Sequence, residues 1–123
     1  MQKEKTKKDI LDRTFKFSVN VLKLTNKLPR NPAGFSLANQ LVRSGTSIGA
    51  NIQEAQSAPS KRDFAHKLNI SLKEARETAY WLDLILESGM ISEKSLGSLR
   101  GECEELIKIL VISLKSLRKN SGL

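Results

Sequence analysis

Residue types that commonly carry chemistry are scarce in this chain. It has one cysteine, Cys103, one histidine, His66, and only 5% aromatic residues. A single cysteine excludes an intrachain disulfide and is typical of a reducing compartment. Because Cys103 lies at helical spacing from Leu99 and Leu106, we interpret it as a buried apolar side chain, with a reactive thiol as the alternative. His66 has no second histidine or cysteine at ligand spacing, so we expect it at the surface rather than in a metal site.

Long hydrophobic segments and catalytic motifs are lacking as well. The longest strongly apolar run, residues 109–114, is too short to cross a bilayer, and Asp12 and Arg13 interrupt the first apolar residues after the initial lysines. We therefore expect a cytoplasmic protein with no secretory signal and no membrane contact. The sequence has no glycine-rich phosphate loop, no Glu-x-x-His pair and no nucleophile with a histidine base. No catalytic residue, metal or cofactor is predicted, and we expect that the protein is not an enzyme.

Positive charge is abundant and unevenly distributed. The net charge is +8, and residues 1–30 hold nine Lys and Arg against three Asp and Glu, whereas residues 31–88 hold six against six. Such a cluster favours polyanions through phosphate neutralisation; a solubilising surface is the alternative. The candidate nucleic-acid-binding residues are Lys3, Lys5, Lys7, Lys8, Arg13 and Lys16. The first four of these would act from a flexible basic arm over about residues 1–8. Because aromatic residues are few, binding should be electrostatic and weakly sequence-specific.

Apolar residues recur at alternating spacings of three and four in four segments. The predicted helices cover residues 6–28, 32–56, 61–88 and 92–120. A proline follows each of the first two, and Gly89 follows the third as a candidate left-handed cap. The second helix could begin at Pro32, with Asn31 as its cap, or at Ser36. We predict a single all-α domain over residues 1–123, folded as an up-down-up-down antiparallel four-helix bundle.

Glycines inside two of these helices suggest close packing. Gly45 and Gly49 lie in the middle of the second helix, where glycine costs about 1 kcal/mol relative to alanine. A neighbouring helix approaching closely is the favoured reason, and a ligand is the alternative. Gly97 and Gly101, four residues apart in the fourth helix, predict a second ridge for close packing.

The second half of the fourth helix is apolar nearly all round. Between residues 106 and 114 only Lys108 and Ser113 are polar. Helices of this kind are buried on more than one side, and a four-helix bundle has no further element to cover the outer side. We therefore expect self-association, with deep burial in a thick monomer as the alternative. The predicted oligomer interface consists of Ile107, Ile109, Val111 and Ile112.

The second helix also carries a polar face. Arg43, Ser47, Asn51 and Glu54 fall on one side of it at 100° per residue. Arg43 and Glu54 are three turns apart, about 16 Å, and cannot pair with each other. Partners on a neighbouring helix or subunit are expected for both. Free solvation is one alternative, and an anion or RNA site at Arg43 is another.

These residues carry a resemblance to a known family. The run from Gln40 to Ala55 resembles the R-x-x-x-S-I-x-A-N-I-x-E signature of bacterial four-helix-bundle proteins encoded in 23S rRNA intervening sequences, often called ribosomal protein S23-like. The segment NISLKEA, with Ser71 and Glu74, is similar to the third-helix pattern of that family. Gly49 stands where the family usually has proline.

The resemblance implies a ring-like homopentamer and kinship with the accessory proteins of diversity-generating retroelements. Together with the charge, it leads us to expect a non-catalytic homo-oligomeric bundle that binds RNA or another nucleic acid through a basic surface, in association with ribosomes or rRNA. The signature residues Arg43, Ser47, Asn51, Glu54, Ser71 and Glu74 are assigned structural or interface roles. The alternative function is a protein-interaction scaffold or accessory factor with no direct nucleic-acid role.

Overall fold

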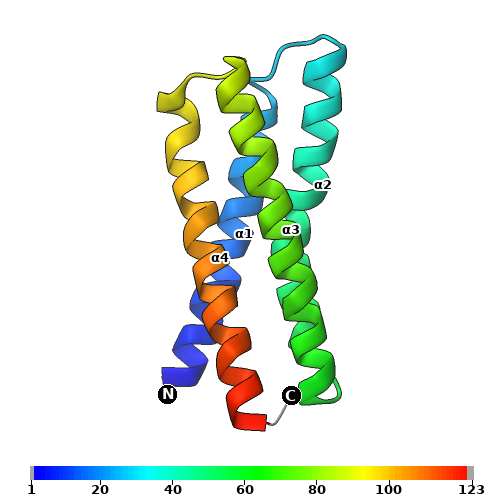
Figure 1. Ribbon diagram of the computed structural model, residues 1–123, viewed down its shortest axis with the longest axis vertical. Helices are drawn as coiled ribbons and strands as arrows, with labels where there is room; N and C mark the ends of the chain where they lie inside the picture. Colours follow the sequence, from blue (N-terminus) through cyan, green and yellow to red (C-terminus); the bar gives the residue numbers. More distant parts are fainter. Residues whose placement is uncertain (1, 122–123) are drawn as a thin grey trace.

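The computed structural model describes residues 2–121, with side chains from residue 9 to residue 120. The helices are α1 (Gln2–Thr25), α2 (Pro32–Ala55), α3 (Lys61–Ser88) and α4 (Glu93–Ser121). Successive helices run in opposite directions along one long axis, so the start of α1 and the end of α4 lie at the same end (Figure 1). The described residues contain no strand. The predicted all-α, up-down-up-down bundle is confirmed.

The first loop shows that α2 begins at Pro32. The Asn31 side chain accepts a hydrogen bond from the Gly34 N–H at 2.8 Å, and Pro32 occupies the first helical turn. Of the two predicted starts, the earlier is therefore right. α1 ends at Thr25 rather than at Leu28, because the Leu28 N–H bonds the Thr25 carbonyl at 3.2 Å in a tight turn in place of a helical hydrogen bond.

Side-chain and glycine caps set the limits of α3. The Ser60 hydroxyl accepts from the Asp63 N–H at 3.1 Å and donates to the Asp63 carboxylate at 2.8 Å. Gly89 follows the helix with φ of 76°, in the left-handed region, and its N–H bonds the Leu86 carbonyl at 3.1 Å. The prediction that Gly89 is a left-handed cap is confirmed.

The core is built from one apolar stripe on each helix. Its largest fully buried apolar side chains are Phe17, Val21, Leu41, Ile48, Ile52, Leu82, Ile85, Leu96, Leu106 and Leu110. Cys103 is fully buried among them, and its thiol donates to the Ala75 carbonyl at 3.3 Å. Burial raises the pKa of this thiol to about 12, so it stays protonated at neutral pH. The interpretation of Cys103 as a core residue is confirmed.

Gly45 and Gly49 of α2 allow α1 to approach α2 closely. A Cβ atom at Gly45 would lie 2.9 Å from Cγ2 of Val21, and one at Gly49 would lie 3.1 Å from Cβ of Thr14. The predicted close approach of a neighbouring helix is confirmed at both positions. At Gly97 and Gly101 nothing lies within 4 Å of such an atom. The prediction of a second packing ridge is wrong within this chain, because those glycines face outward where no other helix passes.

Contacts between helices follow the order of the chain. α2 packs extensively on α1 and α3, and α3 packs on α4, whereas α1 and α4 share the smallest contact. Among the described residues the diagonal pairs, α1 with α3 and α2 with α4, do not meet in this way. The ring of four helices is therefore least tightly closed between α1 and α4.

Candidate nucleic-acid interface

α1 carries a row of polar side chains beside its apolar stripe. Lys16, Asn20 and Lys23 follow one another at spacings of four and three residues on one face of α1, and Lys27 follows in the turn after the helix ends at Thr25. All four are exposed, and all four line a groove between α1 and α4. None of the three lysines forms an ion pair within the described part of the chain. Their charges are therefore available to a ligand.

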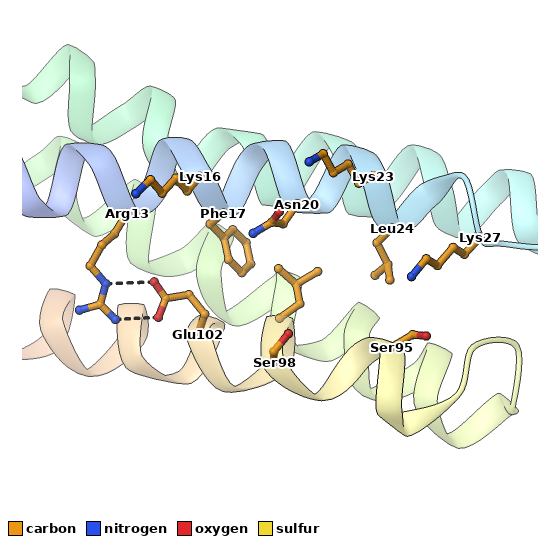
Figure 2. Close-up of a pocket in the computed structure, with 11 residues that line it drawn as sticks. Arg13, Lys16, Phe17, Asn20, Lys23, Leu24, Lys27, Ser95, Ser98 and Glu102 are labelled. Atoms are coloured by element: carbon orange, nitrogen blue, oxygen red, sulfur yellow. Dashed lines mark hydrogen bonds and ion pairs between the residues drawn. The ribbon is translucent and has the colours of Figure 1, made fainter.

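The groove between α1 and α4 has a volume of about 480 Å³. Its floor is formed by Phe17 and Leu24 of α1 and by Leu99 of α4, each at most 6% exposed. Ser95 and Ser98 add hydroxyl groups on the α4 side, opposite the polar row of α1 (Figure 2). The groove thus presents cations on one wall and hydrogen-bonding hydroxyls on the other, which suits phosphate oxygens.

Its one acidic side chain is neutralised. The Arg13 guanidinium donates to both carboxylate oxygens of Glu102, from Nε at 3.0 Å and from Nη2 at 2.6 Å (Figure 2). This paired hydrogen bonding raises the pKa of Arg13. The pair joins α1 to α4 across the groove and cancels the charge of Glu102. The remaining charge of the groove is that of the three lysines.

The predicted nucleic-acid-binding residues divide into two groups. The side chains of Lys3, Lys5, Lys7 and Lys8 lie outside those that the structure describes, so their role stays a prediction. The backbone of residues 2–8 is the first part of α1, where a flexible arm was expected. Arg13 and Lys16 both line the groove, but Arg13 is held by Glu102 whereas Lys16 is not.

Sequence reasoning missed Lys23 and Lys27. Both were counted in the basic first quarter of the chain but were not placed on a face. The signal was present, since they follow Lys16 by seven and eleven residues, or about two and three helical turns. The opposite side of the groove could not be predicted, because Ser95 and Ser98 are about seventy residues away from Lys23 and Lys27 in sequence.

Comparison with known proteins identifies the family. Residues 6–112 match the family described as 23S rRNA-intervening sequence protein. The chain belongs to this family. It is also similar to the crystal structure of a protein of unknown function from the S23 ribosomal protein family of Bacteroides thetaiotaomicron, with 40% sequence identity and a TM-score of 0.81. That match covers 86% of this chain and 98% of the other. No curated protein matches.

The charged residues of the intervening-sequence family signature join α2 to α3. Arg43 donates from Nη1 to Glu74 at 3.2 Å and from Nη2 to Glu77, and Lys67 lies 3.4 Å from Glu54. Both signature charges therefore find partners on a neighbouring helix, as predicted. Arg43 holds the pKa of Glu77 below its usual value. Partial burial and then the charge of Glu77 raise the pKa of Glu74, which outweighs its bond to Arg43.

The uncharged signature residues make internal hydrogen bonds. Ser47 donates to the Arg43 carbonyl at 2.6 Å, and Asn51 donates to the Ser47 carbonyl at 2.8 Å. Ser71 is fully buried and donates to the Ile48 carbonyl of α2 at 2.8 Å. Of these hydrogen bonds, only that of Ser71 joins α3 to α2, whereas those of Ser47 and Asn51 lie within α2.

The four residues of the predicted oligomer interface differ in exposure. Ile107, Ile109 and Val111 are partly buried within the chain, and Ile107 packs against its core. Ile112 is 67% exposed. Self-association through these residues stays a prediction.

The described residues offer no metal centre and no membrane span. They contain no group of three or more His, Cys, Asp and Glu side chains arranged to hold a metal ion. His66 is exposed, as expected. Among the same residues, no helix is both long enough and apolar enough to span a membrane.

Proposed function

We propose that this protein is a non-catalytic, homo-oligomeric bundle that acts in the cytoplasm by binding RNA in the groove between α1 and α4. The observation that carries the proposal is the row formed by Lys16, Lys23 and Lys27, which no acidic side chain of the groove opposes once Arg13 holds Glu102. The family description points to RNA encoded with, or derived from, 23S rRNA as the first ligand to try.

Electrostatic contact accounts for most of the binding expected here. Lys16 and Lys23 are separated by about 10 Å along α1, and Lys27 follows in the turn after that helix. Three cations in line follow a phosphate backbone, and the serines of α4 can donate to its oxygens. The aromatic side chain of the groove, Phe17, is only 1% exposed, so bases have no platform on which to stack. Binding should be insensitive to base sequence.

RNA binding is expected to depend steeply on salt. A labelled 20-nucleotide uridine RNA that contacts three lysines should bind about 20-fold more weakly at 200 mM than at 50 mM salt, since each phosphate contact on a single strand adds about 0.7 to the logarithmic slope. If the four lysines of residues 1–8 also bind phosphates, the same change of salt should cost about 1,000-fold. Fluorescence anisotropy measures both. Absence of binding at 50 mM salt would contradict the proposal and favour the protein-scaffold alternative.

Self-association is supported by exposed apolar side chains. The two largest exposures are those of Phe15 at 70% and Ile112 at 67%. The resemblance to the family implies a pentamer. A homopentamer would cover part of this apolar surface, and kinship with retroelement accessory proteins, also implied by the resemblance, stays a prediction.

Substituting glutamate for Ile112 is expected to weaken the assembly without unfolding the chain. The side chain is already 67% exposed, so the monomer loses little, whereas an interface at this position would have to bury a charge. Sedimentation should show a wild-type mass several times 13.7 kDa. The variant should need at least tenfold more protein to reach that mass.

Phe35→Glu, on α2, is the matched control and should leave the mass unchanged. A wild-type protein that sediments as a monomer at micromolar concentration would refute self-association. A variant that keeps the full mass would exclude Ile112 from the interface.

A further inference from the structure

A second groove lies between α3 and α4, apart from the candidate RNA site. Its volume is about 460 Å³. Four basic side chains line it, two from each helix, together with one amide and three apolar residues. The lining residues are Asn69, Leu72, Lys73, Arg76, Val111, Leu114, Lys115 and Arg118. Unlike the groove between α1 and α4, it has no acidic residue in its lining.

The four cations of the α3–α4 groove have no partners within the described residues. Lys73, Arg76, Lys115 and Arg118 make no ion pair there. The acidic side chains nearest in sequence are engaged elsewhere. Glu77 pairs with Arg43 of α2, on the other side of α3. The charge of Lys73 has only a weak effect on Glu77, whose pKa it lowers. The groove is therefore a site of concentrated positive charge.

Its floor is apolar and accessible. Leu72 and Val111 are only partly buried, in contrast to the nearly inaccessible floor of the α1–α4 groove. Leu114, which completes the floor, is 4% exposed. A ligand in this groove can therefore remove apolar surface from water as well as neutralise charge.

The lining residues form one face of α3 and one face of α4. On α3 they stand at positions 69, 72, 73 and 76, and on α4 at 111, 114, 115 and 118, with the same intervals of three, one and three. Each set covers about 10 Å of helix. A further helix laid between α3 and α4 would place one apolar stripe on the floor and its flanks beside the cations.

From this we infer that the α3–α4 groove binds an acidic amphipathic helix of a partner protein. The helix would present apolar side chains at i, i+3 or i+4, and i+7 to Leu72 and to Val111, a residue that the predicted oligomer interface also includes. Self-association and binding of the partner helix would therefore compete at Val111. Asp or Glu on its flanks would pair with Arg76 and Arg118, whose guanidinium groups bind carboxylates through two hydrogen bonds. Two to three turns of helix fill the groove.

Nucleic acid fits this groove less well than a helix does. Its accessible floor offers hydrocarbon where a sugar-phosphate chain needs polar contact. The serine hydroxyls that line the α1–α4 groove have no counterpart here except the amide of Asn69. The two grooves therefore suit two different kinds of partner.

A designed peptide tests this inference on the full chain. The probe is a fluorescein-labelled 15-residue peptide with leucine on one helical stripe and glutamate on both flanks. The reference probe has the same composition in an order that breaks the stripe. Fluorescence anisotropy should show the ordered peptide binding at least tenfold more tightly than the reference. Arg76→Glu with Arg118→Glu should weaken the ordered peptide at least tenfold.

The control variant, Lys61→Glu with Arg62→Glu, reverses the same number of charges in the first turn of α3 and should change peptide affinity less than twofold. Uridine RNA should lose no more affinity with the groove variant than with this control. Equal binding of the two peptides, or unchanged peptide binding by the groove variant, would overturn the inference. So would a loss of RNA binding specific to the groove variant, or its dissociation in sedimentation, because a nucleic acid or a second copy would then be the occupant.

Discussion

Replacing Lys16, Lys23 and Lys27 with glutamine should weaken RNA binding by about 500-fold at 50 mM salt and by about 30-fold at 200 mM salt. The figures follow from the loss of three phosphate contacts, each contributing about 0.7 to the slope of log affinity against log salt, with the electrostatic contribution vanishing near 1 M. A larger loss of affinity at 50 mM than at 200 mM salt would identify the lost phosphate contacts as its cause. A loss of affinity caused by altered shape or by missing hydrogen bonds would be similar at both salt concentrations.

The triple variant should fold as the wild type does, since all three lysines are exposed and unpaired within the described chain. Its free energy of unfolding should change by no more than about 0.5 kcal/mol for each substitution. The control, Lys61→Gln with Arg62→Gln and Lys108→Gln, removes the same charge away from both grooves and should cost only a few-fold in affinity. If the control weakens RNA as much as the groove variant, overall charge accounts for the binding and the groove is not the site.

Much of the fold could be predicted because it depends on patterns within short stretches of the sequence. Apolar residues spaced by three and four positions predict the apolar stripe of each helix. The prolines and Gly89 predict helix ends where the structure has loops. The partners of Arg43 and Glu54 were predictable in kind, since neither charge can reach the other within one helix. Their identity was not, because the ion pairs with Glu77 and Lys67 depend on how α2 and α3 align.

The candidate site was harder to predict, because it consists of the space between elements. The sequence predicts that Arg13 contacts phosphate, yet it bonds Glu102, which is 89 residues away in sequence. Nothing near Arg13 in the chain indicates that partner. Lys23 and Lys27 were visible in sequence as charges, but they line a groove because folding brings α4 beside α1.

Glycine shows the same limit within a single helix. A helical glycine indicates that the backbone tolerates a close neighbour, but it does not indicate that a neighbour is present. Gly45 faces Val21 of α1, whereas Gly101 faces open space, although both belong to pairs spaced by four residues. Only the position of each pair relative to the apolar stripe separates them. Gly45 lies on the buried side of α2, and Gly101 is exposed on α4.

Leucine at Gly45 or Gly49 should destabilise the bundle by up to about 2 kcal/mol at each position. At Gly45 the new Cβ would lie 2.9 Å from Val21 Cγ2, and at Gly49 it would lie 3.1 Å from Thr14 Cβ and 3.3 Å from the Thr14 backbone carbon. α1 would have to move away from α2 to admit either side chain, and overpacking of this kind costs about 1–3 kcal/mol or more. The gain of about 1 kcal/mol in helix propensity offsets only part of that cost.

The same substitution at Gly97 or Gly101 should have the opposite sign. Nothing lies within 4 Å of a Cβ atom at either position, so leucine adds helix propensity without a clash and should stabilise the chain by about 1 kcal/mol. Urea unfolding followed by circular dichroism at one fixed protein concentration compares the four variants, because self-association would make stability depend on concentration. Equal effects at Gly45 and Gly101 would show that α1 does not rest on the glycines of α2. Destabilisation at Gly97 or Gly101 instead would mean that another copy of the chain packs against α4 there.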